Sequence, residues 1–272
     1  MTATLAPPAE PAAGPPAPRG LPDAAPSVVL EGQGMIVIEP ARLKYGPIRV
    51  GGERGVLTVP ESAADVAGFR RWTVQNDFPD NARIDRVGDR LFVDLSMQRQ
   101  QAHGLPKTEI IARLALRNGE LGFGELTSDV TRVFLPVGET GCEPDVVLVS
   151  YDALESSRVT ETPAADGGDG VELVGPPELV VEVVSPSSVA KDTRDLPAGY
   201  FLGGVQEYWL VDCRDDEAAE VTFLLHRRGS ESFEPVPADA DGFAASAVLG
   251  KAYRLTRARG RLGRWQYRLE ER

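Results

Sequence analysis

The apolar pattern is clearest between Pro176 and Asp212, where it predicts a strand, a turn, a helix and a second strand. Residues 179–184 are almost wholly apolar, as in a strand that is buried on both faces. The segment 185–188 contains a proline and three serines and should end that strand. Residues 208–211 form a second apolar strand. Two strands joined by one helix should lie parallel in a sheet.

The helix between these strands should run from about residue 192 or 193 to residue 202. Asp192 and Thr193 are both favourable N-caps, and Asp195 would lie in the first turn, where the helix dipole favours it. Pro197 is compatible with a helix only in its first turn. Gly203 and the glycine after it form a stop signal at the C-terminal end.

Glu182 interrupts the first of these apolar strands. An unpaired buried carboxylate costs several kcal/mol, roughly, so the residue should have a physical reason to be there. Three explanations stay open: a cation meets Glu182, the carboxyl is protonated, or the position is less buried than the pattern indicates.

The remaining chain predicts an α/β (α+β) protein with extra strands at both ends. Residues 1–27 are rich in proline and alanine and should form a disordered tail. Residues 28–60 should form a small β extension, and residues 61–272 one domain. Within it we expect a helix at 62–76, a hairpin at 82–96, a short amphipathic helix at 107–116 and several strands after residue 212.

Asp145 is a second carboxylate of interest, because it follows Pro144 at the start of an apolar strand. Alone, such a residue is more typical of a turn cap. Only one strand and a long loop separate it from Glu182, so the two carboxylates could lie on neighbouring strands and on one side of the sheet. His103 precedes the helix at 107–116 and Glu109 lies in it; a lone loop histidine is usually solvated.

Composition and charge limit the class of protein. The chain has 272 residues, of which 42% are hydrophobic and 26% charged, and its net charge is −12. We found no apolar run of membrane-spanning length and no secretory signal, and the two cysteines have no metal-site spacing, so we expect a cytoplasmic protein without a membrane partner. The acidity argues against nonspecific coating of nucleic acid. Four arginines could still form a local basic rim, although each singly is more typical of solvated surface charge: Arg113, Arg117, Arg194 and Arg214.

The two carboxylates together suggest a site for Mg²⁺ or Mn²⁺. Such hard cations take carboxylate oxygens and water, with substrate phosphate completing the shell. Asp145 and Glu182 would hold the metal, and the backbone carbonyl of Val183 is a further candidate ligand. Lys191 is the lysine nearest to Glu182 in sequence and would assist the attacking water.

The motifs PD at residues 144–145, VVEVVSPSS and GVQEYWLVD resemble the Uma2 family of restriction-endonuclease-like proteins, within the PD-(D/E)XK nuclease superfamily. The resemblance covers roughly residues 69–255. It implies a mixed central sheet flanked by helices, with Asp145 and Glu182 as the acidic ligands and His103 and Glu109 at the helix that opens the core. The superfamily's lysine would fall at Val184, or on the following helix near Leu196, and neither is a lysine here.

We therefore expect a Mg²⁺- or Mn²⁺-dependent endonuclease that hydrolyses DNA phosphodiester bonds. The alternative is a noncatalytic protein of the same fold that acts as a nucleic-acid-binding or oligomeric interaction module. A homodimer is an option, because nucleases that cut both strands often act as dimers.

Overall fold

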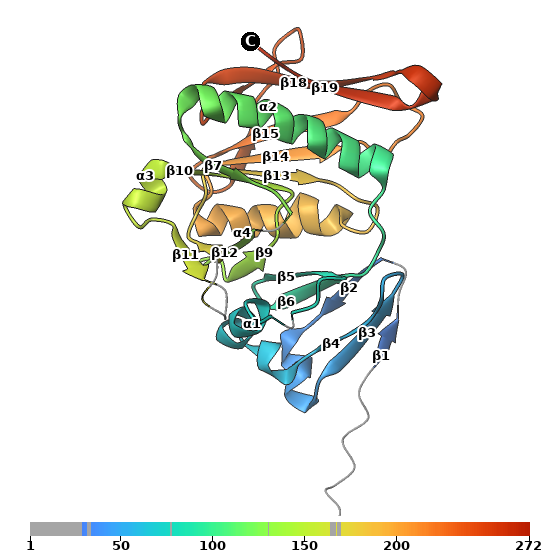
Figure 1. Cartoon of the computed structure of the whole chain (residues 1–272), viewed down its shortest axis with the longest axis vertical. Coiled ribbons are helices and arrows are strands. Elements are labelled where there is room, and N and C mark those ends of the chain that lie inside the picture. Colours follow the sequence, from blue (N-terminus) through green and yellow to red (C-terminus); the bar gives the residue numbers. More distant parts are fainter. Residues whose placement is uncertain (1–28, 32–33, 77, 130, 164–166, 168–169) are drawn as a thin grey trace, which may run out of the picture.

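The computed structural model describes residues 29–31, 34–76, 78–129, 131–163, 167 and 170–272. The predicted tail at residues 1–27 lies outside the described part. Over the described residues the fold is α+β, with a mixed central sheet flanked by helices, which confirms the predicted class (Figure 1). Within these ranges, each helix is too short or too polar to span a lipid bilayer.

The central sheet contains six strands in the order β16-β15-β14-β13-β10-β7. These are β7 (Gly124–Thr127), β10 (Val146–Ser150), β13 (Leu179–Val183), β14 (Glu207–Asp212), β15 (Thr222–Arg228) and β16 (Phe233–Pro235). β13 and β14 are parallel, as predicted, and the other neighbouring pairs are antiparallel. α4 (Leu196–Gly203) lies on the connection between the two parallel strands.

Alternating side chains of the central sheet pack into two different hydrophobic clusters, as the pleat of a strand requires. Val146 and Val181 face α2 (Leu105–Leu121) and the C-terminal strands. Val147 and Val180 face the opposite way, toward α4. Figure 1 shows α2 and α4 on opposite sides of the sheet. α2 is longer than the predicted helix at 107–116.

The helix after β13 begins earlier than predicted. Helical geometry starts at residue 189 and continues through a π-helical turn, η4 (Lys191–Asp195), into α4. Asp192 and Thr193 therefore lie inside the helix, and the prediction that one of them caps it is wrong. Ser185 organises the preceding turn instead, because its Oγ accepts a hydrogen bond from the Ser188 N–H at 3.1 Å.

Pro197 is also not in a first helical turn, contrary to the prediction, because the helix already runs through η4. The π-helical turn explains how the proline is tolerated: the Leu196 N–H donates to the Lys191 carbonyl, five residues back. The C-terminal end agrees with the prediction, since Gly204 ends the helix in the left-handed region with φ of 102°.

A second sheet contains seven strands in the order β11-β12-β8-β9-β5-β6-β2. The predicted hairpin at 82–96 is confirmed as its strands β5 and β6. Its strands are β2 (Met35–Ile38), β5 (Arg83–Val87), β6 (Arg90–Asp94), β8 (Arg132–Leu135), β9 (Thr140–Cys142), β11 (Thr160–Pro163) and β12 (Gly170–Val174). Its β5–β6 part packs on β3 (Ile48–Gly52), β4 (Gly55–Val59) and α1 (Val66–Thr73). α1 is shorter than the predicted helix at 62–76.

Small strand sets lie at the two ends of the molecule (Figure 1). One contains β1 (Val29–Glu31), β3 (Ile48–Gly52) and β4 (Gly55–Val59); the other contains β17 (Ala244–Ser246), β18 (Lys251–Arg259) and β19 (Trp265–Glu271). Short helices complete the chain: η1 (Pro40–Tyr45), η2 (Glu61–Ala64), η3 (Gln100–Gly104), α3 (Tyr151–Glu155) and η5 (Arg261–Gly263). The boundary at residue 60 stays a prediction, and the strands before it share one core with the β5–β6 hairpin.

The contact between α4 and β8 can be tested at a glycine. A Cβ on Gly203 would lie 2.5 Å from Leu135 Cδ1, so Gly203→Ala should destabilise the protein by about 1–3 kcal/mol through overpacking. Gly119 in α2 is the matched control, since a Cβ there meets nothing within 4 Å. Gly119→Ala should stabilise by up to about 1 kcal/mol. Urea denaturation measures both; stabilisation by both substitutions would contradict the close packing of α4.

Candidate active site

Asp145 and Glu182 lie opposite each other on the central sheet. β10 and β13 are antiparallel with Val146 opposite Val181, and one further step along this register places Asp145 opposite Glu182. Both positions alternate with residues that face α2, so both side chains face α4. Both are buried, with exposed fractions of 1% and 2%. The structure thus brings the two predicted carboxylates together.

The Asp145 carboxylate is surrounded by donors. Its Oδ1 accepts hydrogen bonds from Arg83 Nη2 at 2.8 Å and Lys107 Nζ at 3.5 Å. Its Oδ2 accepts the Val183 N–H at 2.7 Å and lies 3.3 Å from His103 Nε2. Burial alone would raise the pKa of Asp145, but Arg83, then His103 and Lys107, hold this pKa well below its usual range. Asp145 is therefore a fixed anion.

Glu182 has the opposite electrostatic character. Its Oε1 accepts a hydrogen bond from the Tyr200 hydroxyl at 2.5 Å. Burial, together with the charges of Asp192 and Asp145, raises the pKa of Glu182 well above its usual range. Of the three explanations that the sequence left open, the exposed position is excluded. Without a bound cation, burial and the neighbouring carboxylates favour the protonated form of this carboxyl.

Lys191 points into the site and not to solvent. Its side chain is 3% exposed, and its Nζ donates to Asp85 Oδ2 at 2.5 Å and lies 3.7 Å from Asp192 Oδ1. Burial alone would lower the pKa of Lys191. The negative charges of Asp85 and Asp192 have a larger effect and raise this pKa above its usual value. Lys191 is therefore a permanent cation, paired chiefly with a residue of β5.

Asp192 completes a set of four buried carboxylates. Burial raises its pKa to about 6, although Lys191 and a hydrogen bond from Ser188 oppose the shift. Among the described residues, its Oδ1 has no hydrogen-bond partner. The four carboxylates are Asp85, Asp145, Glu182 and Asp192. They face Arg83, Lys107 and Lys191, and Asp129 shares the first two of these cations. Carboxylates therefore outnumber the cationic side chains at the site, and a proton or a bound cation would offset part of the negative charge.

The side chains of this site supply only some of the ligands that a divalent cation needs. Within the described ranges, no group of three or more histidine, cysteine or acidic side chains is arranged to hold a metal. Asp145 and Glu182 supply two carboxylates. Val183 turns its N–H toward Asp145, and the carbonyl of a strand residue points to the same side as its N–H. Two carboxylates, a carbonyl and substrate oxygens are an ordinary shell for Mg²⁺.

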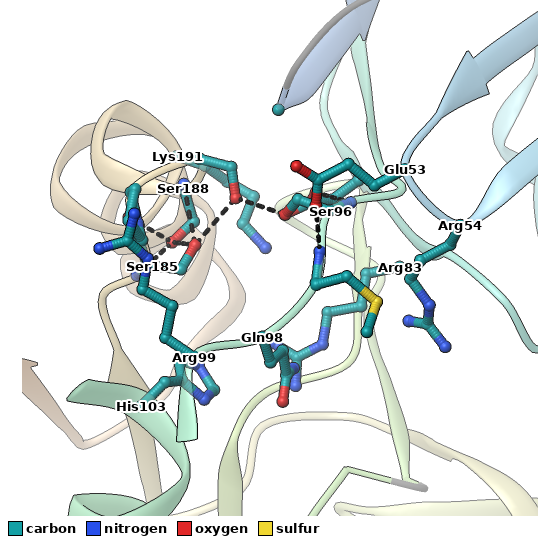
Figure 2. Close-up of a pocket in the computed structure, with 15 residues that line it drawn as sticks. Glu53, Arg54, Arg83, Ser96, Gln98, Arg99, His103, Ser185, Ser188 and Lys191 are labelled. Carbon is teal, nitrogen blue, oxygen red and sulfur yellow. Dashed lines mark hydrogen bonds between the residues drawn. The ribbon is translucent and has the colours of Figure 1, made fainter. Parts of the chain in front are cut away.

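A pocket of about 330 Å³ borders this network, and Figure 2 shows the residues that line it. Arg83, His103 and Lys191 line it, and each contacts Asp145 or Asp85 as well. Further cationic and hydroxyl groups come from several segments: Arg54, Arg99, Ser96, Ser185, Ser187 and Ser188. Two acidic residues also line the pocket, and both accept hydrogen bonds. Glu53 accepts one from the Met97 N–H, and Asp94 accepts one from the Ser187 hydroxyl. The pocket thus presents donors and positive charge, as a phosphate group requires.

Glu109 and the expected basic rim do not contribute to the site. Glu109 Oε1 accepts the Leu269 N–H at 3.1 Å and pairs with Arg113, so its carboxylate faces β19. The other three arginines of the expected rim likewise pair with carboxylates close by in the chain: Arg117 with Glu120, Arg194 with Asp195 and Arg214 with Asp212. These local pairs favour the interpretation of the four arginines as surface charge over that of a basic rim.

Several site residues were missed by the sequence analysis: Arg83, Asp85, Lys107, Asp192 and Tyr200. One signal was present, because Arg83 and Asp85 alternate with Ile84 in the hairpin and so share a face. That polar face normally meets solvent, whereas here Asp85 is 1% exposed. The sequence pattern predicts Asp192 as a helix cap, and it places no chemistry on Tyr200.

Comparisons with known families and structures show what the chain is similar to. A family model described as "Uma2: Putative restriction endonuclease" matches residues 66–255. A crystal structure described as a putative nuclease belonging to DUF820 from Anabaena variabilis ATCC 29413 is similar, with 14% sequence identity and a TM-score of 0.46, over 61% of this chain and 83% of that chain. No curated protein matches the chain significantly.

The raised pKa of Asp192 predicts a pH dependence of stability. Between about pH 4 and pH 6, the folded protein retains a proton on Asp192 that the unfolded chain has released. The free energy of unfolding should therefore fall as pH rises through this window. Asp192→Asn should make the decline shallower by up to about 1.4 kcal/mol per pH unit. Urea denaturation in EDTA measures the slope.

The control for this experiment is Asp80→Asn, which changes an exposed carboxyl and should keep the wild-type slope. An Asp192→Asn protein with the wild-type slope would show that Asp192 does not hold the proton.

The Lys191–Asp85 pair predicts a large coupling. Lys191→Met or Asp85→Asn alone should each cost about 3–5 kcal/mol, because each leaves a buried charge without its main partner. The double variant should recover at least about 2 kcal/mol of the summed loss. Urea denaturation in EDTA gives the double-mutant cycle.

The matched control is the half-exposed pair Arg254–Glu270, whose coupling should stay below about 1 kcal/mol. Equal coupling in the two pairs would mean that Asp85 does not hold Lys191 in place.

Proposed function

The chain belongs to the Uma2 family, and from this premise and the geometry of the site we propose that it is a Mg²⁺- or Mn²⁺-dependent endonuclease that hydrolyses phosphodiester bonds of DNA. One observation carries the proposal: Asp145 and Glu182 face each other under a pocket whose lining is cationic. Arg83 and His103 line the pocket and also contact Asp145, so an anionic phosphate in the pocket would lie next to the groups that hold this carboxylate.

Asp145, Glu182 and the carbonyl of Val183 are the groups that would hold the metal. When bound, the metal would lower the pKa of a water molecule and stabilise negative charge on a phosphoryl oxygen. The protein prepares both carboxylates for this: Asp145 is already ionised, and Glu182 would release its proton when a cation replaces it.

The remaining side chains would bind the phosphate. Arg83 and Lys191 line the pocket and carry permanent charge, so they would pair with phosphate oxygens. Lys191 has too high a pKa to take a proton from water, and its role would be to stabilise negative charge in the transition state. His103 Nδ1 is buried and, in the described part of the chain, lacks a hydrogen-bond partner.

A noncatalytic role is the second candidate, and one observation favours it. Asp145 is already neutralised by Arg83, and Asp85 by Lys191, without any metal. Such saturated pairs also occur in purely structural networks. In that role the protein would be a nucleic-acid-binding or oligomeric interaction module of the same fold.

Glu182→Gln separates the two candidates. The substitution removes an ionisable carboxyl but keeps an acceptor for Tyr200, so apo stability should stay the same or rise. Mn²⁺ binding should be lost, and plasmid cleavage in Mn²⁺ should fall by more than about 100-fold. We would measure Mn²⁺ binding by calorimetry with a short noncleavable duplex present, because phosphate completes the metal shell.

Glu125→Gln is the matched control, since Glu125 is exposed on β7 of the same sheet, and it should bind and cleave like the wild type. Absence of Mn²⁺ binding in the wild type, or equal binding in the Glu182→Gln protein, would make Glu182 a structural residue and favour the noncatalytic role. A large loss of apo stability in Glu182→Gln would lead to the same conclusion.

A further inference from the structure

The C-terminal hairpin carries a concentration of positive charge that the candidate site does not use. β18 and β19 are antiparallel, from Tyr253 opposite Glu271 to Arg259 opposite Trp265, and η5 joins them at the tip. Residues 251–269 contain six arginines and one lysine and no acidic residue, in a chain whose net charge is −12. The tip lies beyond residue 255, where the family match ends.

Two of these arginines are committed to the fold. Arg257 is buried and donates to the backbone carbonyls of Cys213 and Ala218. Arg259 donates to the carbonyl of Asp216, and its guanidinium lies 3.6 Å from the ring centroid of Trp265. These contacts fasten the acidic loop after β14 to the base of the hairpin tip.

Three other arginines are exposed: Arg261, Arg264 and Arg268. Within the described residues, ion pairs form at Arg254 and Arg272 near the opposite end of the hairpin, but at none of these three. They differ in this respect from the four arginines of the expected rim, each of which pairs with a carboxylate. Arg261 and Arg264 at the tip, and Arg268 farther along β19, therefore carry positive charge that no described carboxylate neutralises.

Leu262 lies at the end of the tip and is 86% exposed. Its φ is +65°, in the left-handed region that a leucine rarely adopts, and no burial compensates for this conformation. Strained residues of this kind often have a role in binding. An exposed apolar residue between arginines is the pattern of side chains that enter a nucleic-acid groove beside the phosphates.

The tip is anchored next to the candidate site. The Trp265 N–H donates to Gln101 Oε1 at 3.2 Å, and the indole Nε1 donates to Asp216 Oδ1 at 2.7 Å. Gln101 belongs to η3, the same π-helical turn that carries His103 to within 3.3 Å of Asp145. Figure 1 shows the hairpin lying along α2, which follows η3 directly.

We propose that the β18–β19 tip is a docking ribbon for duplex DNA, in which Arg261, Arg264 and Arg268 bind backbone phosphates and Leu262 enters a groove. Apolar side chains of this kind enter the minor groove beside arginines that contact the phosphates. A duplex held at the tip would extend past η3 to the pocket above Asp145. The inference rests on the proposed function and adds to it the surface that holds the substrate.

Fluorescence anisotropy with a short labelled duplex, in EDTA and with the full chain, tests the ribbon without cleavage. The double substitution Arg261→Gln with Arg264→Gln should weaken binding at least about tenfold. It should also reduce the magnitude of the slope of log K against log salt concentration by about 1.8, the value for two lost phosphate contacts. Arg42→Gln with Lys44→Gln is the control of equal charge change, since both residues are exposed in η1 at the other end of the molecule. The control should bind like the wild type.

Leu262→Gly tests the groove contact separately. Glycine adopts this φ freely, so the variant should be at least as stable as the wild type. It should bind the duplex several-fold more weakly with an unchanged salt slope. Unchanged affinity would exclude insertion of Leu262 into a groove.

The outcomes distinguish the ribbon from the nuclease. Wild-type affinity in the Arg261/Arg264 variant, an equal loss in the control, or no duplex binding by the wild type would overturn the ribbon. Salt-dependent binding through the tip without cleavage in Mg²⁺ or Mn²⁺ would support the ribbon and reject the nuclease. Cleavage with an unchanged KM in the Arg261/Arg264 variant would reject the ribbon and leave the nuclease intact.

Discussion

The arrangement of the two sheets depends on the hydrogen bonds and ion pairs of the buried Asp145 carboxylate. A charge with 1% exposure is tolerated only if its desolvation is offset by partners. Those partners come from separate parts of the fold: Arg83 from β5 of the second sheet, Lys107 and His103 from α2 and η3, and Val183 from the neighbouring strand β13. One side chain therefore holds β5 of the second sheet against the central sheet and its helix.

The same junction produces the pocket. The polar face of β5 is buried against the central sheet. There Asp85 forms an ion pair with the Lys191 ammonium, and Arg83 forms one with Asp145. The turn between β3 and β4 closes one side of the space that remains, because the Arg54 N–H donates to the Leu95 carbonyl and Glu53 accepts the Met97 N–H. Residues before the family match thus shape the pocket, although the carboxylates beneath it lie within that match.

Local signals in the sequence were sufficient to predict the strand–helix–strand unit and its two parallel strands. They also indicated Asp145 and Glu182, because a carboxylate in or beside an apolar strand is conspicuous. Arg83 and Asp85 could not be predicted, since an alternating hairpin looks the same whether its polar face meets water or another sheet. Only the packing of residues far apart in the chain decides that. Glu109 was assigned wrongly for the same reason: its helix is amphipathic, and the β19 strand that covers it lies 160 residues away.

The two π-helical turns link local sequence to the chemistry of the site. Each precedes a Leu-Pro pair, at residues 105–106 and at residues 196–197. A proline inside an α-helix loses one hydrogen bond and clashes with the carbonyl four residues back. A π-helical turn relieves this, because the leucine N–H donates five residues back, to Gln100 in one helix and to Lys191 in the other. These two turns carry residues of the site. His103 lies in one turn and contacts Asp145, and Lys191 lies in the other and contacts Asp85.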